Sequence, residues 1–186
     1  MTDSFSKIIQ ELNNKNFNKA LELLEEYPED NEPHILNNLK GIIFINLKNH
    51  SKAIECFKNS LNYKENYIDA HLNLANAYFS NKNISKSIDI IRKALNYEPK
   101  NKKLNFNLAF FFSESYQYQK AIKQYHEVNK LGYNKEIILN NIEKIYIKEK
   151  NYLKAKEYFL ECLKINSSNH LTINNLIRSL ILKKDF

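Results

Sequence analysis

The chain has 186 residues, a formal net charge of +7, and only 2 glycines and 3 prolines. So little turn chemistry excludes a protein built from β-hairpins, and no alternating run of polar and apolar residues predicts strands. The longest apolar runs, such as residues 42–45 and 108–112, are too short to span a membrane, and residues 1–10 lack the apolar core of a signal peptide. We therefore expect an all-α protein of the cytoplasm.

The positive charge comes almost entirely from lysine. Of the 28 basic residues only Arg92 and Arg178 are arginine. Asparagine is abundant and tryptophan is absent, a combination that is typical of a coding sequence rich in A and T. Proteins that bind nucleic acid usually gather arginine and lysine on one face, whereas lysine here recurs at the solvent side of helix starts. The composition therefore argues against nucleic acid as a partner.

Pairs of amphipathic helical patterns recur along the chain with a period of 34 residues. The units occupy about residues 1–33, 34–67, 68–101, 102–135 and 136–169, with a partial unit at 170–186. The first unit is the least regular and is one residue shorter. The third is the clearest, and the fourth is rich in aromatic residues. An uninterrupted repeat of this kind leaves no linker between separate domains.

The same residue classes return at the same position of each unit when position 1 is placed at residue 34 and its equivalents. Position 8 of the first helix holds Gly41, Ala75, Ala109, Glu143 and Ile177, and position 11 holds Phe44, Tyr78, Phe112, Tyr146 and Leu180. In the second helix, position 20 holds Ala20, Ala53, Ser87, Ala121 and Ala155, and position 24 holds Leu24, Phe57, Ile91, Tyr125 and Phe159. Small residues beside large ones let the two helices of a unit pack closely.

This pattern resembles that of the tetratricopeptide repeat family, with small residues at 8 and 20, aromatic residues at 11 and 24 and a proline at 32. The resemblance implies an all-α, right-handed α-solenoid of helix-turn-helix repeats, with 1–186 as a single array. Three features depart from the family pattern. No unit has a tryptophan at position 4, the proline is kept only as Pro99, and Glu143 and Ile177 replace small residues at position 8. We therefore expect looser packing in the fifth unit.

The sixth unit stops where its second helix should begin. Its first helix, in 170–183, would leave Leu176, Leu180 and Ile181 as an exposed apolar edge. Two expectations follow. The chain is the front part of a longer protein, or it self-associates through this C-terminal edge.

No pattern of catalytic or metal-binding residues is present. The two glycines are too few for a phosphate-binding loop, and the five histidines have no ligand spacing. Tyr125-His126-Glu127 has the residue types of a general base, but a histidine at position 25 of a repeat is usually a surface residue. Cys56 and Cys162 lie inside helices of different units, and we expect two buried thiols in a reducing compartment. We predict no catalysis within these residues, no cofactor and no metal.

The resemblance also implies a binding groove. In tetratricopeptide arrays the first helices line a concave face, into which positions 2, 5, 6, 9, 12 and 13 point. Position 6 holds Asn73, Asn107, Asn141 and Asn175. Each amide offers a donor and an acceptor together, so the series can pair with the backbone of an extended peptide. It is similar to the asparagine ladder that holds the substrate polypeptide in O-linked N-acetylglucosamine transferases. The alternative is repeat duplication in a chain with 29 asparagines.

Neighbouring groove positions add aromatic and basic side chains. Besides the four asparagines, the predicted site comprises Asn76, Phe79, Lys103, Phe106, Phe110, Asn140, Lys144, Lys148, Asn174 and Arg178. Because the basic residues outweigh Asp69 and Glu114 toward the C-terminal end, an extended segment with apolar anchors and some acidic residues would complement the groove. A carboxylate clamp for chaperone C-termini is not favoured. The best window supplies Asn73 and Lys103, but Asn38, Ile42 and Asn107 stand where the other partners should be.

The sequence thus predicts a noncatalytic protein–protein interaction module that binds an extended peptide or a partner protein in the groove. Two alternatives remain open. One is the N-terminal, substrate-presenting repeat region of a larger glycosyltransferase or sulfotransferase. The other is a scaffold that self-assembles through its uncovered C-terminal helix.

Overall fold

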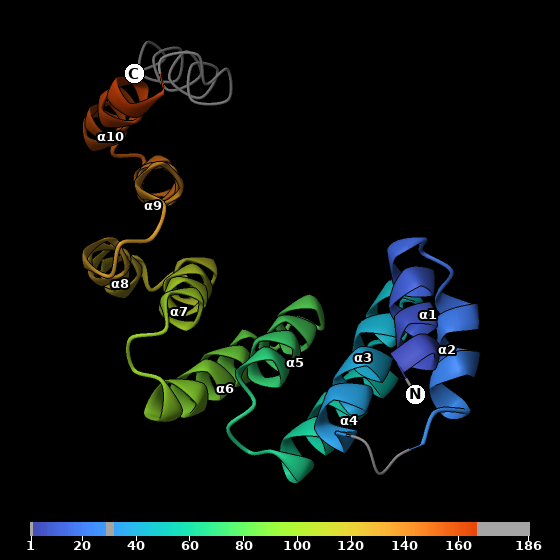
Figure 1. Cartoon of the computed structure of the whole chain (residues 1–186). Helices are drawn as coiled ribbons and strands as arrows, with labels where there is room; N and C mark the ends of the chain where they lie inside the picture. The colour runs from blue at the N-terminus through green and yellow to red at the C-terminus, as the bar shows by residue number, and fades with distance from the viewer. Residues whose placement is uncertain (1, 29–31, 167–186) are drawn as a thin grey trace. The chain divides into compact units, whose positions relative to one another are not determined.

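The computed structural model describes residues 2–28 and 32–166, and these residues form ten α-helices and no strand. The helices are α1 (Thr2–Asn13), α2 (Phe17–Glu25), α3 (Pro33–Asn46), α4 (His50–Tyr63), α5 (Ile68–Ser80), α6 (Ile84–Tyr97), α7 (Lys102–Glu114), α8 (Tyr118–Lys130), α9 (Lys135–Lys148) and α10 (Tyr152–Ile165). Consecutive helices pack in pairs, from α1 with α2 to α9 with α10 (Figure 1). The helices α3, α5, α7 and α9 begin within one residue of the predicted unit starts. The predicted all-α repeat architecture is therefore confirmed.

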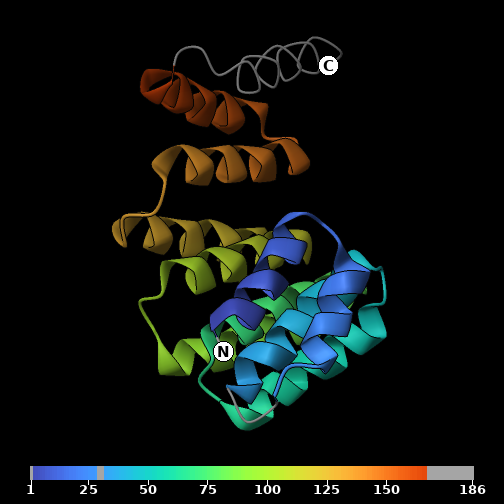
Figure 2. The same cartoon turned by 45° about the vertical axis from the view of Figure 1, so that its right-hand side comes forward.

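The chain forms two compact units, residues 1–97 and residues 98–186. Unit 1 contains the helices α1–α6, which are three predicted repeats, and the described part of unit 2 contains α7–α10. The boundary falls in the loop between the third and fourth repeats, so the described helices of each unit form whole repeats. Figure 2 shows the helices of unit 2 stacked in the order α7, α8, α9 and α10. No helix in the described part of the chain is long and apolar enough to cross a membrane.

In unit 1 the helices α3 and α4 pack closely at Gly41. A Cβ atom at this position would lie 2.6 Å from Cδ1 and 2.8 Å from Cζ of Phe57. The Phe57 side chain is only 1% exposed, so its ring is held on all sides. At position 20 of the next repeat, the buried Ser87 hydroxyl donates to the Ala75 carbonyl oxygen (2.8 Å). Small residues at positions 8 and 20 therefore let the two helices of a repeat pack closely, as the sequence predicts.

The core of unit 2 follows the same positions with one exception. Ala109, Ala121 and Ala155 are fully buried beside Tyr125 and Phe159. Glu143, which takes position 8 in the fifth repeat, is also 0% exposed, so the larger residue is accommodated inside the repeat. Ile177, the other departure at this position, lies outside the described residues.

The turns between paired helices share one backbone conformation. The residue at position 15 has a left-handed φ in all five: Lys15 (61°), Lys48 (60°), Lys82 (59°), Tyr116 (60°) and Lys150 (58°). One residue later, the Asn49, Asn83 and Asn151 side chains accept a hydrogen bond from the backbone N–H three residues on, each at 3.2 Å. These asparagines cap the second helix of their repeat.

The lysines at position 19 lie over the aromatic rings at position 11. The ammonium groups of Lys52, Lys86, Lys120 and Lys154 are 5.3, 5.3, 5.9 and 5.2 Å from the ring centroids of Phe44, Tyr78, Phe112 and Tyr146. Such cation–π contacts stabilise a helix pair by roughly 0.5–1 kcal/mol at exposed sites. The repeated lysine that the sequence places at the solvent side of helix starts therefore belongs to the packing of the second to fifth repeats. In the first repeat Lys19 instead pairs with Glu22.

His71 is the one strongly buried histidine among the described residues, at 1% exposure. Its Nε2 is 2.8 Å from the carbonyl oxygen of Glu65, which can only accept, so Nε2 carries the proton. Nδ1 has no hydrogen-bond partner in the described residues. The Tyr97 ring lies 6.0 Å away, and the Glu65 side chain forms an ion pair with Lys93 (2.9 Å). Burial lowers the pKa of His71, and Lys93 lowers it further, whereas the contacts to Glu65 raise it.

We expect unit 1 to lose stability as the pH falls below about 6.5, the ordinary pKa of histidine in an unfolded chain. The folded pKa of His71 is depressed, so in this range the unfolded chain takes up a proton that the folded unit excludes. His71→Gln keeps a donor toward Glu65 and should remove this part of the pH dependence of urea unfolding between about pH 7.5 and 5.5. His126→Gln, at an exposed site on α8, should leave it in place. An unchanged pH dependence in His71→Gln would contradict the assignment.

Candidate functional site

The predicted binding residues of unit 1 lie on α5. Asn76 is exposed and Phe79 is half-buried. Asn73 is half-buried, and its Nδ2 donates to Oδ1 of Asn38 on α3 (2.9 Å). Asn38 is 5% exposed and also hydrogen-bonds the Tyr67 side chain. Asn73 is therefore part of a polar contact that joins two first helices.

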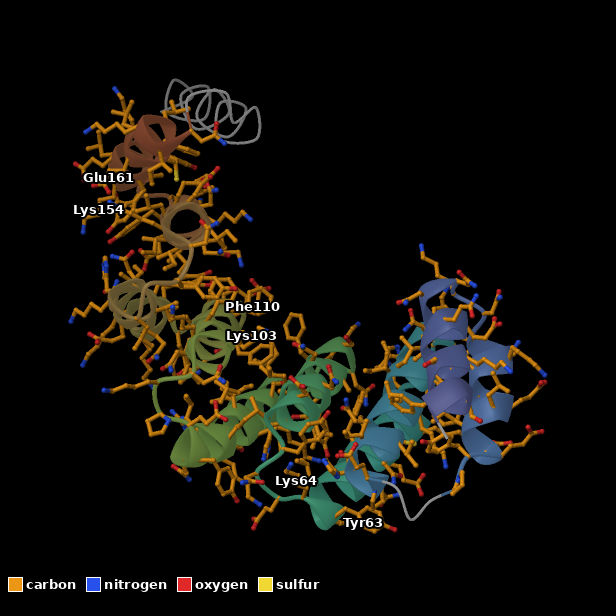
Figure 3. The ribbon with its side chains drawn as sticks, in the orientation of Figure 1. Tyr63, Lys64, Lys103, Phe110, Lys154 and Glu161 are labelled. Carbon is orange, nitrogen blue, oxygen red and sulfur yellow. The ribbon has the colours of Figure 1, made fainter. Side chains whose placement is uncertain are left out.

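The predicted residues of unit 2 form stripes on α7 and α9. The predicted residues are Lys103, Phe106, Asn107 and Phe110 on α7, and Asn140, Asn141, Lys144 and Lys148 on α9. Together with Glu114 on α7 and Ile137 on α9, we call them the first-helix face of unit 2. Spacings of three and four residues put each set on one side of its helix. Figure 3 shows Lys103 and Phe110 on the side of α7 that points away from α8.

Asn107 and Asn141 adopt the same side-chain arrangement. Nδ2 of Asn107 donates to the Lys103 carbonyl oxygen (2.8 Å), and Nδ2 of Asn141 donates to the Ile137 carbonyl oxygen (2.7 Å). Each amide is thus fixed on its own helix by a bond to the residue four positions earlier. The second N–H and the Oδ1 of each amide have no partner among the described residues. Both groups are therefore oriented before any ligand arrives.

Aromatic rings border these amides. Phe106 stacks on Tyr133 with ring centroids 4.8 Å apart and an interplanar angle of 17°, and it meets the edge of Tyr125 at 5.7 Å. Phe110 packs against Phe111 at 5.6 Å. Phe106 and Phe110 are half-buried, so part of each ring reaches the surface. This is the arrangement of an apolar anchor point beside polar groups.

The charges of the face are unequal. Lys148 forms an ion pair with Glu114 (2.8 Å), which joins α9 to the end of α7. Lys103 and Lys144 are exposed, and neither has an acidic partner in the described residues. The face therefore presents two lysines beside one neutralised pair.

The side chain of Asn140 accepts a hydrogen bond from a buried thiol. Cys162 is 1% exposed, and its Sγ donates to Oδ1 of Asn140 at 3.3 Å. Burial, with smaller contributions from neighbouring glutamates, raises the pKa of Cys162 to about 11. Cys56 is only half-buried, so the expectation of two buried thiols is wrong for this residue. Position 23, which Cys56 occupies, is partly exposed in every repeat.

The remaining predictions concern catalysis and the C-terminal edge. The Tyr125 side chain is in the core and His126 is exposed, so these neighbours do not face one site. In residues 2–28 and 32–166 no group of three His, Cys, Asp or Glu residues is placed to hold a metal ion. The predicted site residues Asn174, Asn175 and Arg178 lie outside the described residues. So do Leu176, Leu180 and Ile181, on which the expected self-association rests.

Comparisons with known proteins give a consistent assignment. A family model described as TPR repeat matches residues 41–82, and one described as tetratricopeptide repeat matches residues 68–101 and 139–169. No curated protein sequence matches the chain. These matches cover repeats in both units.

Solved structures with this fold share little sequence with the chain. A tetratricopeptide repeat protein from Parabacteroides merdae is 12% identical, with a TM-score of 0.86 over 98% of this chain and 73% of that one. MamA from Desulfovibrio magneticus RS-1 is 15% identical, with a TM-score of 0.78 over 91% and 96%. YrrB, described as a TPR protein with an unusual peptide-binding site, is 13% identical, with a TM-score of 0.72 over 92% and 89%. The repeat matches show that the chain belongs to the tetratricopeptide repeat proteins, and the solved structures show that it shares their fold.

Proposed function

We propose that the chain binds an extended segment of a partner protein along the first-helix face of unit 2. Tetratricopeptide repeats act as protein-interaction modules, and the family assignment supports that role in general terms. The observation that carries the specific proposal is the matched pair Asn107 and Asn141. Both amides are held by the same bond to their own helix, at the same position of successive repeats.

Side-chain amides whose orientation is already fixed are suited to bind a peptide backbone. Each one presents a donor and an acceptor, which is what a peptide unit also presents. Because the side chains are already ordered, binding loses less conformational entropy than it would with mobile amides. Phe106 and Phe110 add apolar surface for a side chain of the segment. The peptide-binding site named for YrrB, a protein of the same fold, adds support.

Asn73 is assigned a different role. Its Nδ2 is bonded to the buried Asn38, so removing it would leave a buried acceptor without its donor. Asn73→Ala would therefore mix a loss of stability with any loss of binding. The test of the proposal therefore changes Asn107 and Asn141 and leaves Asn73 in place.

The variant Asn107→Ala/Asn141→Ala is expected to bind extended peptides about 5- to 150-fold more weakly than the wild type, since two hydrogen bonds each contribute roughly 0.5–1.5 kcal/mol. Peptides selected by display on the full wild-type chain would be compared by fluorescence anisotropy. The control is Asn96→Ala/Asn129→Ala, which removes two exposed asparagines from the second helices α6 and α8. Equal binding by both variants, with helical content unchanged, would rule out the first-helix face.

A further inference from the structure

The net charge of the chain is carried entirely by one of its two units. Residues 1–97 contain 12 basic and 12 acidic residues, whereas residues 98–186 contain 16 basic and 9 acidic residues. The whole net charge of +7 therefore belongs to unit 2. Long-range attraction of an anionic partner will act on this unit and not on unit 1.

Many lysines of unit 2 already have a structural role. Lys120 and Lys154 lie over aromatic rings, Lys130 pairs with Glu127 at 2.8 Å, and Lys148 pairs with Glu114. Lys103 and Lys144 do not, and both lie on the first-helix face, seven repeat positions apart and therefore ~10 Å apart along the helix direction. They flank the amides of Asn107 and Asn141.

We infer that the segment bound on this face is an acidic stretch of a partner protein, whose carboxylates contact Lys103 and Lys144. This inference rests on the proposed function and adds the chemistry of the ligand. The amides hold the backbone of the segment and the lysines select its side chains. The Glu114–Lys148 pair is already neutral and so leaves the two lysines as the charges that discriminate.

An acidic protein segment fits these residues better than a nucleic acid does. The basic residues of the described part of unit 2 are all lysines, and the planar, bidentate contacts that arginine makes with phosphate are absent from this part. The Phe106 ring is stacked on Tyr133, and one of its faces is therefore closed to a nucleotide base. Amides in fixed positions match a peptide backbone, which repeats donors and acceptors, better than a sugar-phosphate chain, which offers acceptors.

The test compares an acidic peptide with its uncharged copy. Both would be extended peptides of about twelve residues, which at ~3.3 Å per residue is long enough to cross two helices. One carries Glu and Asp between Leu and Ser, and the other has Gln and Asn in their place. The full chain should bind the acidic peptide about 2- to 30-fold more tightly at low salt, from two exposed ion pairs. The difference should shrink as salt is added.

Lys103→Glu/Lys144→Glu should abolish or reverse this preference. Lys123→Glu/Lys156→Glu makes the same change of net charge at exposed sites on the second helices α8 and α10, and it should keep most of the preference. Equal loss in both variants would mean that only the net charge matters, and it would overturn the inference. So would tighter binding of a single-stranded oligonucleotide than of the acidic peptide in direct competition.

The outcomes also separate this inference from the proposed function. If both peptides bind equally and Asn107→Ala/Asn141→Ala weakens both, the peptide-binding face stands and the acidic ligand is wrong. If neither peptide binds the wild type, both proposals fail. Helical content measured by circular dichroism confirms that each variant is folded.

Discussion

Gly41→Ala is expected to destabilise unit 1 by about 1–3 kcal/mol, although alanine is the better helix former. The new methyl group would lie 2.6 Å from Cδ1 of Phe57, well inside van der Waals contact. The ring cannot move aside because it is 1% exposed and packed in the core. The repeat must therefore shift α3 away from α4. Urea unfolding followed by circular dichroism would measure the loss.

A second substitution tests the cause. In the third repeat the equivalent pair is Ala75 with Ile91, and both residues are fully buried. Gly41→Ala/Phe57→Ile copies that pair and should recover part of the lost stability. If the double variant is less stable than the sum of the two single changes, the ring of Phe57 is not what excludes the methyl group.

Tyr125→Phe is expected to stabilise unit 2 by about 1–2 kcal/mol, because it removes a buried hydroxyl that lacks a partner. The Tyr125 side chain is 0% exposed, and its hydroxyl has no hydrogen-bond partner among the described residues. Burial also raises the pKa of this phenol, so ionisation offers no relief. The same position holds phenylalanine in two other repeats, Phe57 and Phe159, so the core accepts the smaller group.

Tyr158→Phe is the matched control. The Tyr158 hydroxyl hydrogen-bonds Tyr146, and its removal should be neutral or destabilising. Thermal unfolding of the two variants beside the wild type would show shifts of opposite sign, or a shift in Tyr125→Phe alone. A lower midpoint for Tyr125→Phe would show that its hydroxyl is satisfied in solution.

The helices and the core were predictable because they depend on periodicity. The small residue at Gly41 recurs in the next two repeats and the large residue at Phe57 in all of the next three, and this spacing places the two at a helix contact. The roles of the asparagines were not predictable in this way. Asn73 and Asn141 share a position, but Asn73 has Asn38 as its neighbour on the preceding first helix, whereas Asn141 has Phe106 at that place. Only Asn38 can accept a hydrogen bond, so the same residue type joins two helices in one case and folds onto its own helix in the other.

The candidate site shows a similar limit. The sequence places Lys103, Lys144 and Lys148 on the same face, since helical spacing decides which residues line up. It does not show that Lys148 is paired with Glu114, because that contact joins residues on different helices. The uneven division of charge can be counted from the sequence, but it has meaning only once the boundary after Tyr97 is known.

The turns between paired helices, each with one left-handed residue, affect the order in which a repeat folds. Four lysines and one tyrosine adopt a conformation that costs a non-glycine residue roughly 1–2 kcal/mol. The unfolded chain will therefore rarely form these turns by itself, and a helical hairpin is not present in advance as a local nucleus. Contacts between helices, such as Gly41 against Phe57, must form together with the turn. We expect the two helices of each repeat to make their contact and form their connecting turn in the same step.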